Sequence, residues 1–348
     1  MKALITGGMG FIGSHLCELL LAGGHEVALV DNLSTGRAEN VAHLAGHKRL
    51  QIHIGNVRDK ALMESLLEQN EVVFHLAAVV GVRSVLNDPL NCLDTNIRGT
   101  DMLMELACRY GNKVLIASSS EVYGKGTEGL LSENSNRILG PTTVTRWVYS
   151  VTKAVDECLA MSYAKGHGLP VVVMRFFNTV GPRQSSQYGM VLPTFVQQAL
   201  KGEPITVYGD GSQIRSFTYV ADAVHAAAAL SQTEAAYGEV FNIGGTEPVS
   251  IAELAQRVKR ITGSKSSIEF IPYEVAYGDG FEDSVVRVPD ISKLHAAIGY
   301  EPQYSLNDMI VNTIEYFLER QPDIAPRRSV AISLNRAPTM EENACQSR

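Results

Sequence analysis

The chain opens with a short apolar segment, residues 2–5, that leads directly into a glycine-rich loop. The loop reads Thr6-Gly-Gly-Met-Gly-Phe-Ile-Gly13, with glycines at Gly7, Gly10 and Gly13, and a helical pattern follows at once. Glycines between a strand and a helix permit a tight turn and the close approach of a pyrophosphate, whose charge is stabilised by the helix N-terminus. This arrangement predicts a βαβ unit that binds a dinucleotide.

Strand-like and helix-like segments then alternate through the first half of the chain. The expected strands are 3–6, 26–31, 50–54, 72–76, 114–118 and 171–176, and the expected amphipathic helices are 14–22, 61–69, 96–110 and 151–165. This alternation is typical of a parallel sheet with helices on both faces. We therefore expect a doubly wound α/β fold of the Rossmann type, with the isolated strand 240–243 returning to the main sheet.

The regular alternation of expected strands and helices ends at about residue 178, and beyond it Gly and Pro separate shorter elements. We expect an NAD-binding domain at 1–178 plus about 216–250, and a smaller C-terminal substrate-binding domain at 179–215 and 251–320. From residue 321 to 348 the chain turns to Pro, Arg, Ser and Asn without periodicity, so we expect a poorly ordered tail.

Bulk composition excludes several classes of protein. The net charge of -7 over 348 residues argues against a nucleic-acid-binding surface. No apolar segment reaches transmembrane length, and the opening strand leaves no room for a signal peptide, so we expect no membrane contact and a cytoplasmic protein. The five cysteines lack metal-ligand spacing, and four of them lie in helix-like segments, where a cysteine is usually a small core residue, so we expect no metal site.

The second expected strand ends at Asp31, 18 residues after Gly13. A carboxylate at this position can bind the adenosine ribose hydroxyls and repels a 2′-phosphate, which favours NAD over NADP. Arg37 lies close by in the sequence and could instead accommodate a 2′-phosphate.

Tyr149 and Lys153 lie four residues apart, on one face of an expected helix. A nearby ammonium lowers the pKa of a phenol from about 10 towards neutrality, which produces a general base. Such pairs are common by chance. This one gains meaning from the serines at 118–120, which stand where a strand ends and can hold a substrate oxygen.

Further motifs accompany these residues in order: DNLSTG (31–36), HLAA (75–78), SSSEVYG (118–124), YSVTK (149–153), RFFNTVGPR (175–183), RSFTYVADAV (215–224) and RVPDISKLHAAIGYEP (287–302). Together with the glycine loop they resemble the extended short-chain dehydrogenase/reductase family, and within it the nucleotide-sugar epimerase/dehydratase branch. The resemblance covers about residues 1 to 320.

The resemblance implies that tightly held NAD oxidises the C4 hydroxyl of a nucleotide sugar. Ser119 would orient the hydroxyl, Tyr149 would remove its proton, and Lys153 would tune Tyr149 and bind the nicotinamide ribose. The implied cofactor contacts are Gly7, Gly10, Phe11, Ile12, Gly13, Asp31, Asn32, Ser34, Thr35, Gly36, Asn56, Val57, Leu76, Ala77, Ala78, Asn96, Ser118, Tyr149 and Lys153. Asn56 departs from the family's usual aspartate, although an amide can still bond adenine.

The resemblance also implies a substrate site. Arg215 would bind the diphosphate and Tyr208 the base, although a solvated loop arginine and a half-buried strand aromatic are the alternatives. Val180 replaces a tyrosine found in many relatives. The implied substrate contacts are Arg83, Ser120, Asn178, Arg183, Val191, Leu192, Tyr208, Arg215 and Arg287.

Residue 121 separates the reactions that share a 4-keto intermediate. A 4,6-dehydratase typically has Asp-Glu before Val-Tyr-Gly, but here the pair is Ser120-Glu121. Epimerase relatives usually have Ser, Thr or Ala at position 121. SSSEVYG and RWVYSVTK (146–153) resemble UDP-glucuronate decarboxylases, whose glutamate and arginine at the positions of Glu121 and Arg287 are needed for catalysis. The expected activity is NAD-dependent decarboxylation of a UDP-uronic acid, from UDP-glucuronate to UDP-xylose.

Chemistry constrains the roles of Glu121 and Arg287. Arginine is a poor proton donor because its pKa exceeds 12, so Arg287 is expected to anchor the carboxylate, stabilise the enolate or organise a proton-bearing water. Glu121 would repel the substrate carboxylate or share in C5 protonation. The structural alternatives are a salt bridge of Glu121 and an ion pair of Arg287 with Asp283 or Asp290.

Three alternatives to the decarboxylase activity stay open, and the resemblance also implies a partner subunit. The segment Val80-Gly-Val-Arg-Ser84 resembles UDP-sugar 4-epimerases, so epimerisation of UDP-glucuronate or UDP-glucose is the second activity. A different nucleotide-sugar reaction is the third. A non-enzymatic NAD-binding protein is disfavoured by the intact Ser–Tyr–Lys set. The resemblance further implies a homodimer through two helices, with apolar faces that include Leu103, Leu106, Ala107, Val155 and Leu159.

Overall fold

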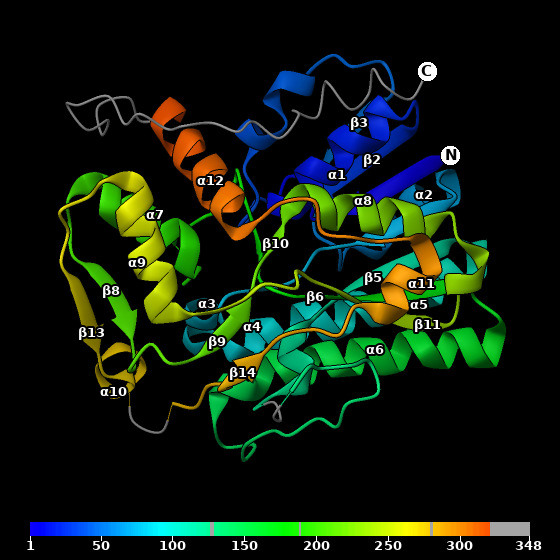
Figure 1. Cartoon of the computed structure of the whole chain (residues 1–348). Coiled ribbons are helices and arrows are strands. Elements are labelled where there is room, and N and C mark those ends of the chain that lie inside the picture. Colours follow the sequence, from blue (N-terminus) through cyan, green and yellow to red (C-terminus); the bar gives the residue numbers. More distant parts are fainter. Residues whose placement is uncertain (126–128, 188, 279–280, 321–348) are drawn as a thin grey trace.

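The computed structural model describes residues 1–125, 129–187, 189–278 and 281–320. Its centre is a sheet of seven parallel strands in the order β11-β6-β5-β4-β1-β2-β3 (Figure 1). These strands are β1 (Lys2–Thr6), β2 (Glu26–Asp31), β3 (Leu50–Ile54), β4 (Val72–His75), β5 (Lys113–Ser119), β6 (Val171–Phe176) and β11 (Glu239–Ile243). The expected doubly wound fold is confirmed, as is the return of the strand near residue 240.

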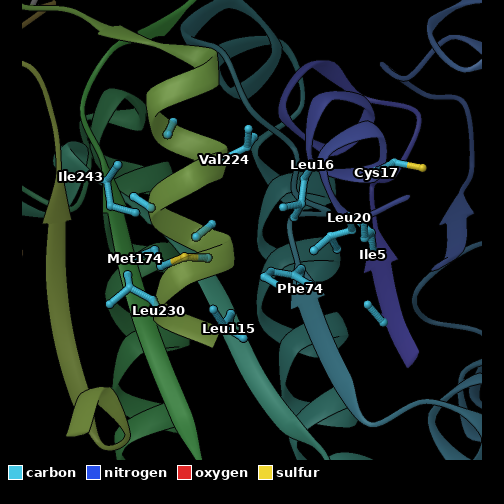
Figure 2. Close-up of a cluster of buried hydrophobic side chains, with 14 of the residues drawn as sticks. Ile5, Leu16, Cys17, Leu20, Phe74, Leu115, Met174, Val224, Leu230 and Ile243 are labelled. Atoms are coloured by element: carbon cyan, nitrogen blue, oxygen red, sulfur yellow. The ribbon is translucent and has the colours of Figure 1, made fainter. Parts of the chain in front are cut away.

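Helices cover both faces of the sheet because successive strand side chains point to opposite sides. Ile5 and Phe74 pack against the first face, beneath α1 (Phe11–Ala22) and α8 (Val220–Ser231), and Figure 2 shows this cluster. Their neighbours Leu4 and Val73 face the other side, where α2 (Lys60–Gln69), α5 (Gly99–Tyr110) and α6 (Val148–His167) pack. The continuous apolar runs of the strands therefore reflect burial on both faces.

A second hydrophobic core forms around α7 (Val191–Lys201), α9 (Ile251–Thr262) and α12 (Leu306–Arg320). Beside it β8 (Ile205–Tyr208) pairs with β13 (Ile268–Ile271), and β9 (Ile214–Ser216) lies between β12 (Pro248–Ser250) and β14 (Val286–Arg287). A short pair joins β7 (Thr179–Val180) to β10 (Thr218–Tyr219). Phe217 and Tyr219 belong to this second core, whereas α8 immediately after them returns to the main sheet.

Shorter elements complete the described part of the chain. They are α3 (Val82–Asn87), α4 (Pro89–Leu93), α10 (Tyr273–Tyr277), α11 (Ser292–Ile298), the π-helical turn η3 (Asp94–Arg98), and the 3₁₀ turns η1 (Ala38–Asn40), η2 (Ala42–Leu44), η4 (Ser120–Tyr123), η5 (Thr145–Trp147) and η6 (Glu234–Ala236). The helix expected at 96–110 thus begins as η3 and continues as α5. The tail expected at 321–348 lies outside the described residues.

Cys17 and Cys92 are buried, as expected of small core residues, but Cys158 is exposed because it lies on the outer side of α6. The fifth cysteine, Cys345, lies outside the described residues. No helix in the described ranges is long and apolar enough to cross a membrane.

The topology determines where a ligand can bind. Strand β1 lies between β2 and β4, so the chain reverses its direction of winding at this point. In open α/β sheets this switch point leaves a crevice at the carboxyl ends of the strands. The glycine loop after β1 and the serines that end β5 both lie at that edge.

Candidate active site

A cavity of about 730 Å³ opens at the carboxyl edge of the sheet. One wall comes from the loops that follow β1, β2, β4 and β5, and the other comes from α7, β8, β9 and β14 of the second core. A concave site between two cores with several convergent polar groups is the usual setting of a ligand site.

The glycine loop at one end of the cavity has the geometry of a phosphate cradle. Gly7 has φ +68°, and a Cβ on Gly13 would lie 2.3 Å from the Gly7 carbonyl oxygen. The first N–H groups of α1, as of any helix, have no intrahelical acceptors. No side chain caps this N-terminus, so these N–H groups can bind an anion. The residues present therefore fit a dinucleotide pyrophosphate.

Asp31 ends β2 beside this loop and lines the cavity. Its carboxylate accepts hydrogen bonds from the backbone N–H groups of Met9 (3.0 Å) and Leu33 (2.8 Å), which fixes its position. A Cβ on Gly36 would lie 2.6 Å from this carboxylate, so Gly36 makes room for it. Arg37 is exposed and does not line the cavity. This geometry fits the ribose of NAD.

Most of the expected cofactor residues line the cavity, but Gly36, Asn56 and Asn96 do not. The Asn56 side chain instead accepts from the Arg58 backbone N–H (2.9 Å). Asn96 is buried, accepts from the Val79 N–H (2.8 Å) and donates to the Thr152 hydroxyl (3.1 Å). Asn96 therefore ties the loop after β4 to α6 behind the cavity wall.

Ser119 and Tyr149 meet in the middle of the cavity. Ser119 is the last residue of β5, Tyr149 lies in the first turn of α6, and both residues line the cavity. Burial and the negative charge of Glu121 raise the pKa of Tyr149 above its ordinary value. Lys153 also lines the cavity, but its ammonium contacts Asp156 at 3.1 Å. The expected lowering of the phenol pKa is thus not found in this arrangement.

Glu121 lies next to this pair, in η4, and is held by two arginines. Its carboxylate accepts from Arg146 at 2.8 Å and from Arg287. Burial alone raises the pKa of a carboxyl, but the guanidinium groups of Arg146 and Arg287 outweigh it and hold the pKa of Glu121 well below its usual range. Glu121 is therefore a fixed carboxylate with a salt bridge on each side.

Asp283 extends the network to Arg215, which is 2.9 Å away, and also faces Arg146 at 3.5 Å. Arg287 thus pairs with Glu121 and not with Asp283 or Asp290. Burial and the neighbouring Arg287 lower the pKa of Arg215 to about 10. Three buried guanidinium groups against two carboxylates leave the cavity wall with an excess of positive charge.

Most of the expected substrate residues line the same cavity: Arg83, Ser120, Asn178, Val191, Leu192, Tyr208, Arg215 and Arg287. Arg183 does not, because its guanidinium pairs with Glu18 on α1. Arg83 from α3 donates to the Tyr208 hydroxyl at 3.0 Å. This bond crosses the cavity mouth between the two cores.

Sequence reasoning missed Arg146 and an aromatic group. Arg146 belongs to the segment RWVYSVTK, which carried the resemblance, yet no role was assigned to it. Tyr277 packs on Tyr208 (ring centroids 5.3 Å apart) and stacks on Phe281 (4.2 Å), and all three line the cavity. The only sequence signal for this group was the cluster of aromatic residues between 273 and 281.

The fold and the site together define an enzyme of the extended short-chain dehydrogenase/reductase class. The chain belongs to the GDP-mannose 4,6 dehydratase family, whose model matches residues 4–313. It is 42% identical, over 92% of its length and 99% of the relative's, to UDP-N-acetyl-alpha-D-glucosaminuronate decarboxylase from Bacillus cytotoxicus. It is 37% identical to UDP-glucuronic acid decarboxylase 1 from Danio rerio, over 91% of this chain and 72% of the relative.

A solved structure extends the comparison. UDP-glucuronic acid 4-epimerase from Bacillus cereus, in complex with UDP-glucuronic acid and NAD, superposes with a TM-score of 0.84 at 31% identity. The match covers 92% of this chain and all of the epimerase chain. Epimerase and decarboxylase relatives thus share this scaffold, so the reaction must be argued from the site.

Proposed function

We propose that this enzyme is a carboxy-lyase that uses bound NAD to decarboxylate a UDP-uronic acid, as in the conversion of UDP-glucuronate to UDP-xylose. The observation that carries the proposal is the position of Glu121 between Arg146 and Arg287, beside Ser119 and Tyr149. Arginines can bind a sugar carboxylate there, and the fixed anion among them has no use in a simple epimerisation. The two decarboxylase relatives named above support the loss of CO₂ from a UDP-uronic acid.

The oxidising residues act on the C4 hydroxyl. Ser119 would hold the hydroxyl by a hydrogen bond, and Tyr149 would remove its proton. The glycine loop, Asp31 and Lys153 would hold NAD, which accepts hydride from C4 and returns it at the end of the cycle. Each of these side chains or loops lines the cavity.

The carboxylate becomes labile once C4 is a ketone, because a β-keto acid loses CO₂ as the carbonyl takes up the electron pair. Arg287, with Arg146, would bind the carboxylate and stabilise the developing enolate. The enolate would then take a proton at C5 from a water held by Arg287, which restores the C4 ketone before hydride returns to it. Glu121 is ionised in this setting, so it would act by repelling the substrate carboxylate and not as a proton donor. Its loss of contact with Arg287 when substrate binds would be part of this strain.

The rest of the nucleotide sugar would occupy the second core, which we propose as the substrate-binding domain at 179–215 and 251–320. Arg215 is buried at the cavity wall and suits the diphosphate. Tyr208 and its aromatic neighbours suit the base. The NAD-binding domain would then be 1–178 with about 216–250.

The experiment is to incubate the protein with UDP-glucuronate and, separately, with UDP-N-acetylglucosaminuronate. Mass spectrometry is expected to show loss of CO₂ from one of them, with NMR identifying a pentose product. An unchanged mass with an altered H4 coupling would refute decarboxylation. Glu121→Ser is expected to suppress CO₂ release, and full activity of this variant would contradict the role given to Glu121.

Epimerisation at C4 is the second candidate. The observation in its favour is Arg83, from the segment that resembles 4-epimerases, which lines the cavity. An arginine at this position would contact the substrate carboxylate in either reaction. The product analysis described above separates the two activities directly.

We also propose a homodimer formed through the outer side of α6. Val151 is 37% exposed there, and Val155 and Leu159 are partly exposed, which leaves an apolar strip. The expected contribution of Leu103, Leu106 and Ala107 is wrong, because these side chains are fully buried against the chain's own sheet. Val151→Glu is expected to shift the mass in multi-angle light scattering from dimer to monomer, and an unchanged mass would refute this surface.

A further inference from the structure

A buried carboxylate holds the lysine of the oxidising set. Asp156 lies three residues after Lys153 on α6, its side chain is completely buried, and its Oδ2 is 3.1 Å from the Lys153 Nζ. The Asp156 Oδ1 is also buried and has no hydrogen-bond partner within the described residues. The lysine is only 2% exposed, so neither charge is screened by water.

Fold stability alone does not account for this acid. A buried ion pair recovers little more than the cost of desolvating its two charges, and a well-packed apolar side chain of similar volume often does as well or better. Asp156 also keeps one oxygen unsatisfied, which adds to the cost. The ammonium that it holds, however, is the one nearest to Tyr149 on the same helix.

The charged and titratable groups around Tyr149 come from several elements. Glu121 faces it from η4, Cys92 from α4, and Lys153 and Asp156 from its own helix; His75 on β4 faces Lys153. Burial, together with the lysine charge, lowers the pKa of His75 to about 3, so it stays neutral. Burial raises the pKa of the Cys92 thiol, so it stays neutral as well.

Glu121 also raises the pKa of Tyr149, but it is tied to two arginines on the substrate side, whereas the Lys153–Asp156 pair lies on the helix of Tyr149 itself. We infer that Asp156 is a positioning residue that anchors the Lys153 ammonium and sets the pH at which Tyr149 can act as a base. This inference rests on the proposed function only in taking Tyr149 as that base.

Removal of the Asp156 charge is expected to make Tyr149 ionise more readily. Tyr149 and Asp156 are separated by about 10 Å along the helix, and a unit charge at that distance shifts a pKa by about 1 unit at an effective dielectric constant of about 20. Asp156→Asn preserves the shape and leaves the Lys153 charge uncompensated. The acidic limb of the pH profile of turnover is therefore expected to move about 1 pH unit lower.

A second readout does not depend on turnover. The ultraviolet titration of the protein minus that of its Tyr149→Phe variant isolates the ionisation of Tyr149, and the midpoint is expected to fall in the Asp156→Asn background. Asp222→Asn is the control, since Asp222 is a buried aspartate on α8 that accepts from the Gln303 N–H and lies outside the cavity. The control is expected to leave the midpoint unchanged.

An unchanged or higher Tyr149 midpoint in Asp156→Asn would overturn the inference and leave Asp156 a packing residue. If Asp156→Asn does not fold, Asp156→Ser serves for the same two measurements. Because the spectroscopic titration needs no substrate, it can fail while decarboxylation is observed, or succeed while the enzyme proves to be an epimerase.

Discussion

Glu121→Gln tests the electrostatic account of the active site most directly. The substitution keeps the shape of the side chain and removes the charge that Arg146 and Arg287 now neutralise. Arg287 would then be free for the carboxylate of the substrate, and Arg146 would keep its 3.5 Å contact with Asp283. We expect the variant to bind UDP-glucuronate more tightly than the parent protein and to decarboxylate it more slowly.

The size of the effect follows from the shared arginines. Two carboxylates that flank one guanidinium lie about 6 Å apart, and at effective dielectric constants of about 40 to 20 they repel by about 1.4 to 2.8 kcal/mol. Glu121 is 16% exposed, which favours the lower value. Binding is therefore expected to tighten about tenfold. Loss of the same repulsion removes ground-state strain, so kcat is expected to fall at least about tenfold.

Calorimetry with UDP-glucuronate gives Kd, and single-turnover CO₂ release gives the chemical rate. Glu247→Gln is the matched control, because Glu247 pairs with Arg257 outside the cavity and its loss is expected to change neither quantity. Weaker binding by Glu121→Gln, or an unchanged rate, would refute the reasoning. The pH profile of the wild-type chemical rate gives a further check. If this rate falls with rising pH as a group with a pKa of about 4 to 6 loses its proton, Glu121 would instead be identified as an acid.

Three further predictions follow from single residues. Tyr149→Phe is expected to abolish the transient NADH absorbance on mixing with UDP-glucuronate, and its persistence would exclude the phenol as the base. Gly13→Ala is expected to weaken NAD binding at least about tenfold in a fluorescence titration, because its Cβ would meet the Gly7 carbonyl at 2.3 Å; normal affinity would contradict the phosphate cradle. Burial raises the pKa of Asp222 to about 6, so the folded state holds this proton more tightly than the unfolded chain. Stability is then expected to fall by up to about 3 kcal/mol as the pH rises from about 4 to 6, and Asp222→Asn should remove this dependence in urea unfolding.

The sheet could be predicted because its signals are local. The continuous apolar runs, the glycine loop and the helical spacing each fix an element within a few residues, and alternation then requires parallel strands. Six of the expected strands and the returning strand near residue 240 lie in the main sheet. The start of the helix expected at 96–110 was predicted less accurately. A π-helical turn at 94–98 precedes the α-helix, and such a turn leaves the hydrophobic period almost unchanged.

The partners within the site could not be predicted, because they join segments far apart in the sequence. Arg146 meets Glu121 from a stretch 25 residues away, but Asp283 contacts Arg146 and Arg215 across 137 and 68 residues of sequence. Periodicity carries no information about such pairs. The same limit explains Arg183, whose pairing with Glu18 on α1 keeps it away from the cavity.

The position of Lys153 was also beyond the sequence pattern. The four-residue spacing from Tyr149 places the ammonium on the correct face of α6, and it implied a lowered phenol pKa. The pattern did not reveal that Asp156, one turn further on, takes up that charge at 3.1 Å. A motif gives the residues of a catalytic set, whereas their pKa values depend on every charge packed around them.

Glu121 and Asp156 therefore place two buried carboxylates near one phenol, and each raises the pKa of Tyr149. Because Glu121 pairs with arginines and Asp156 pairs with a lysine, removal of each carboxylate is expected to change a different property of the enzyme. Glu121 shares Arg287 with the expected site of the substrate carboxylate, so its removal changes both binding and the loss of CO₂. Asp156 contacts only the oxidising side of the site, so its removal should shift the pH dependence of oxidation and leave uronate affinity unchanged. An equal effect of both substitutions on uronate affinity would show that the two carboxylates belong to one electrostatic unit.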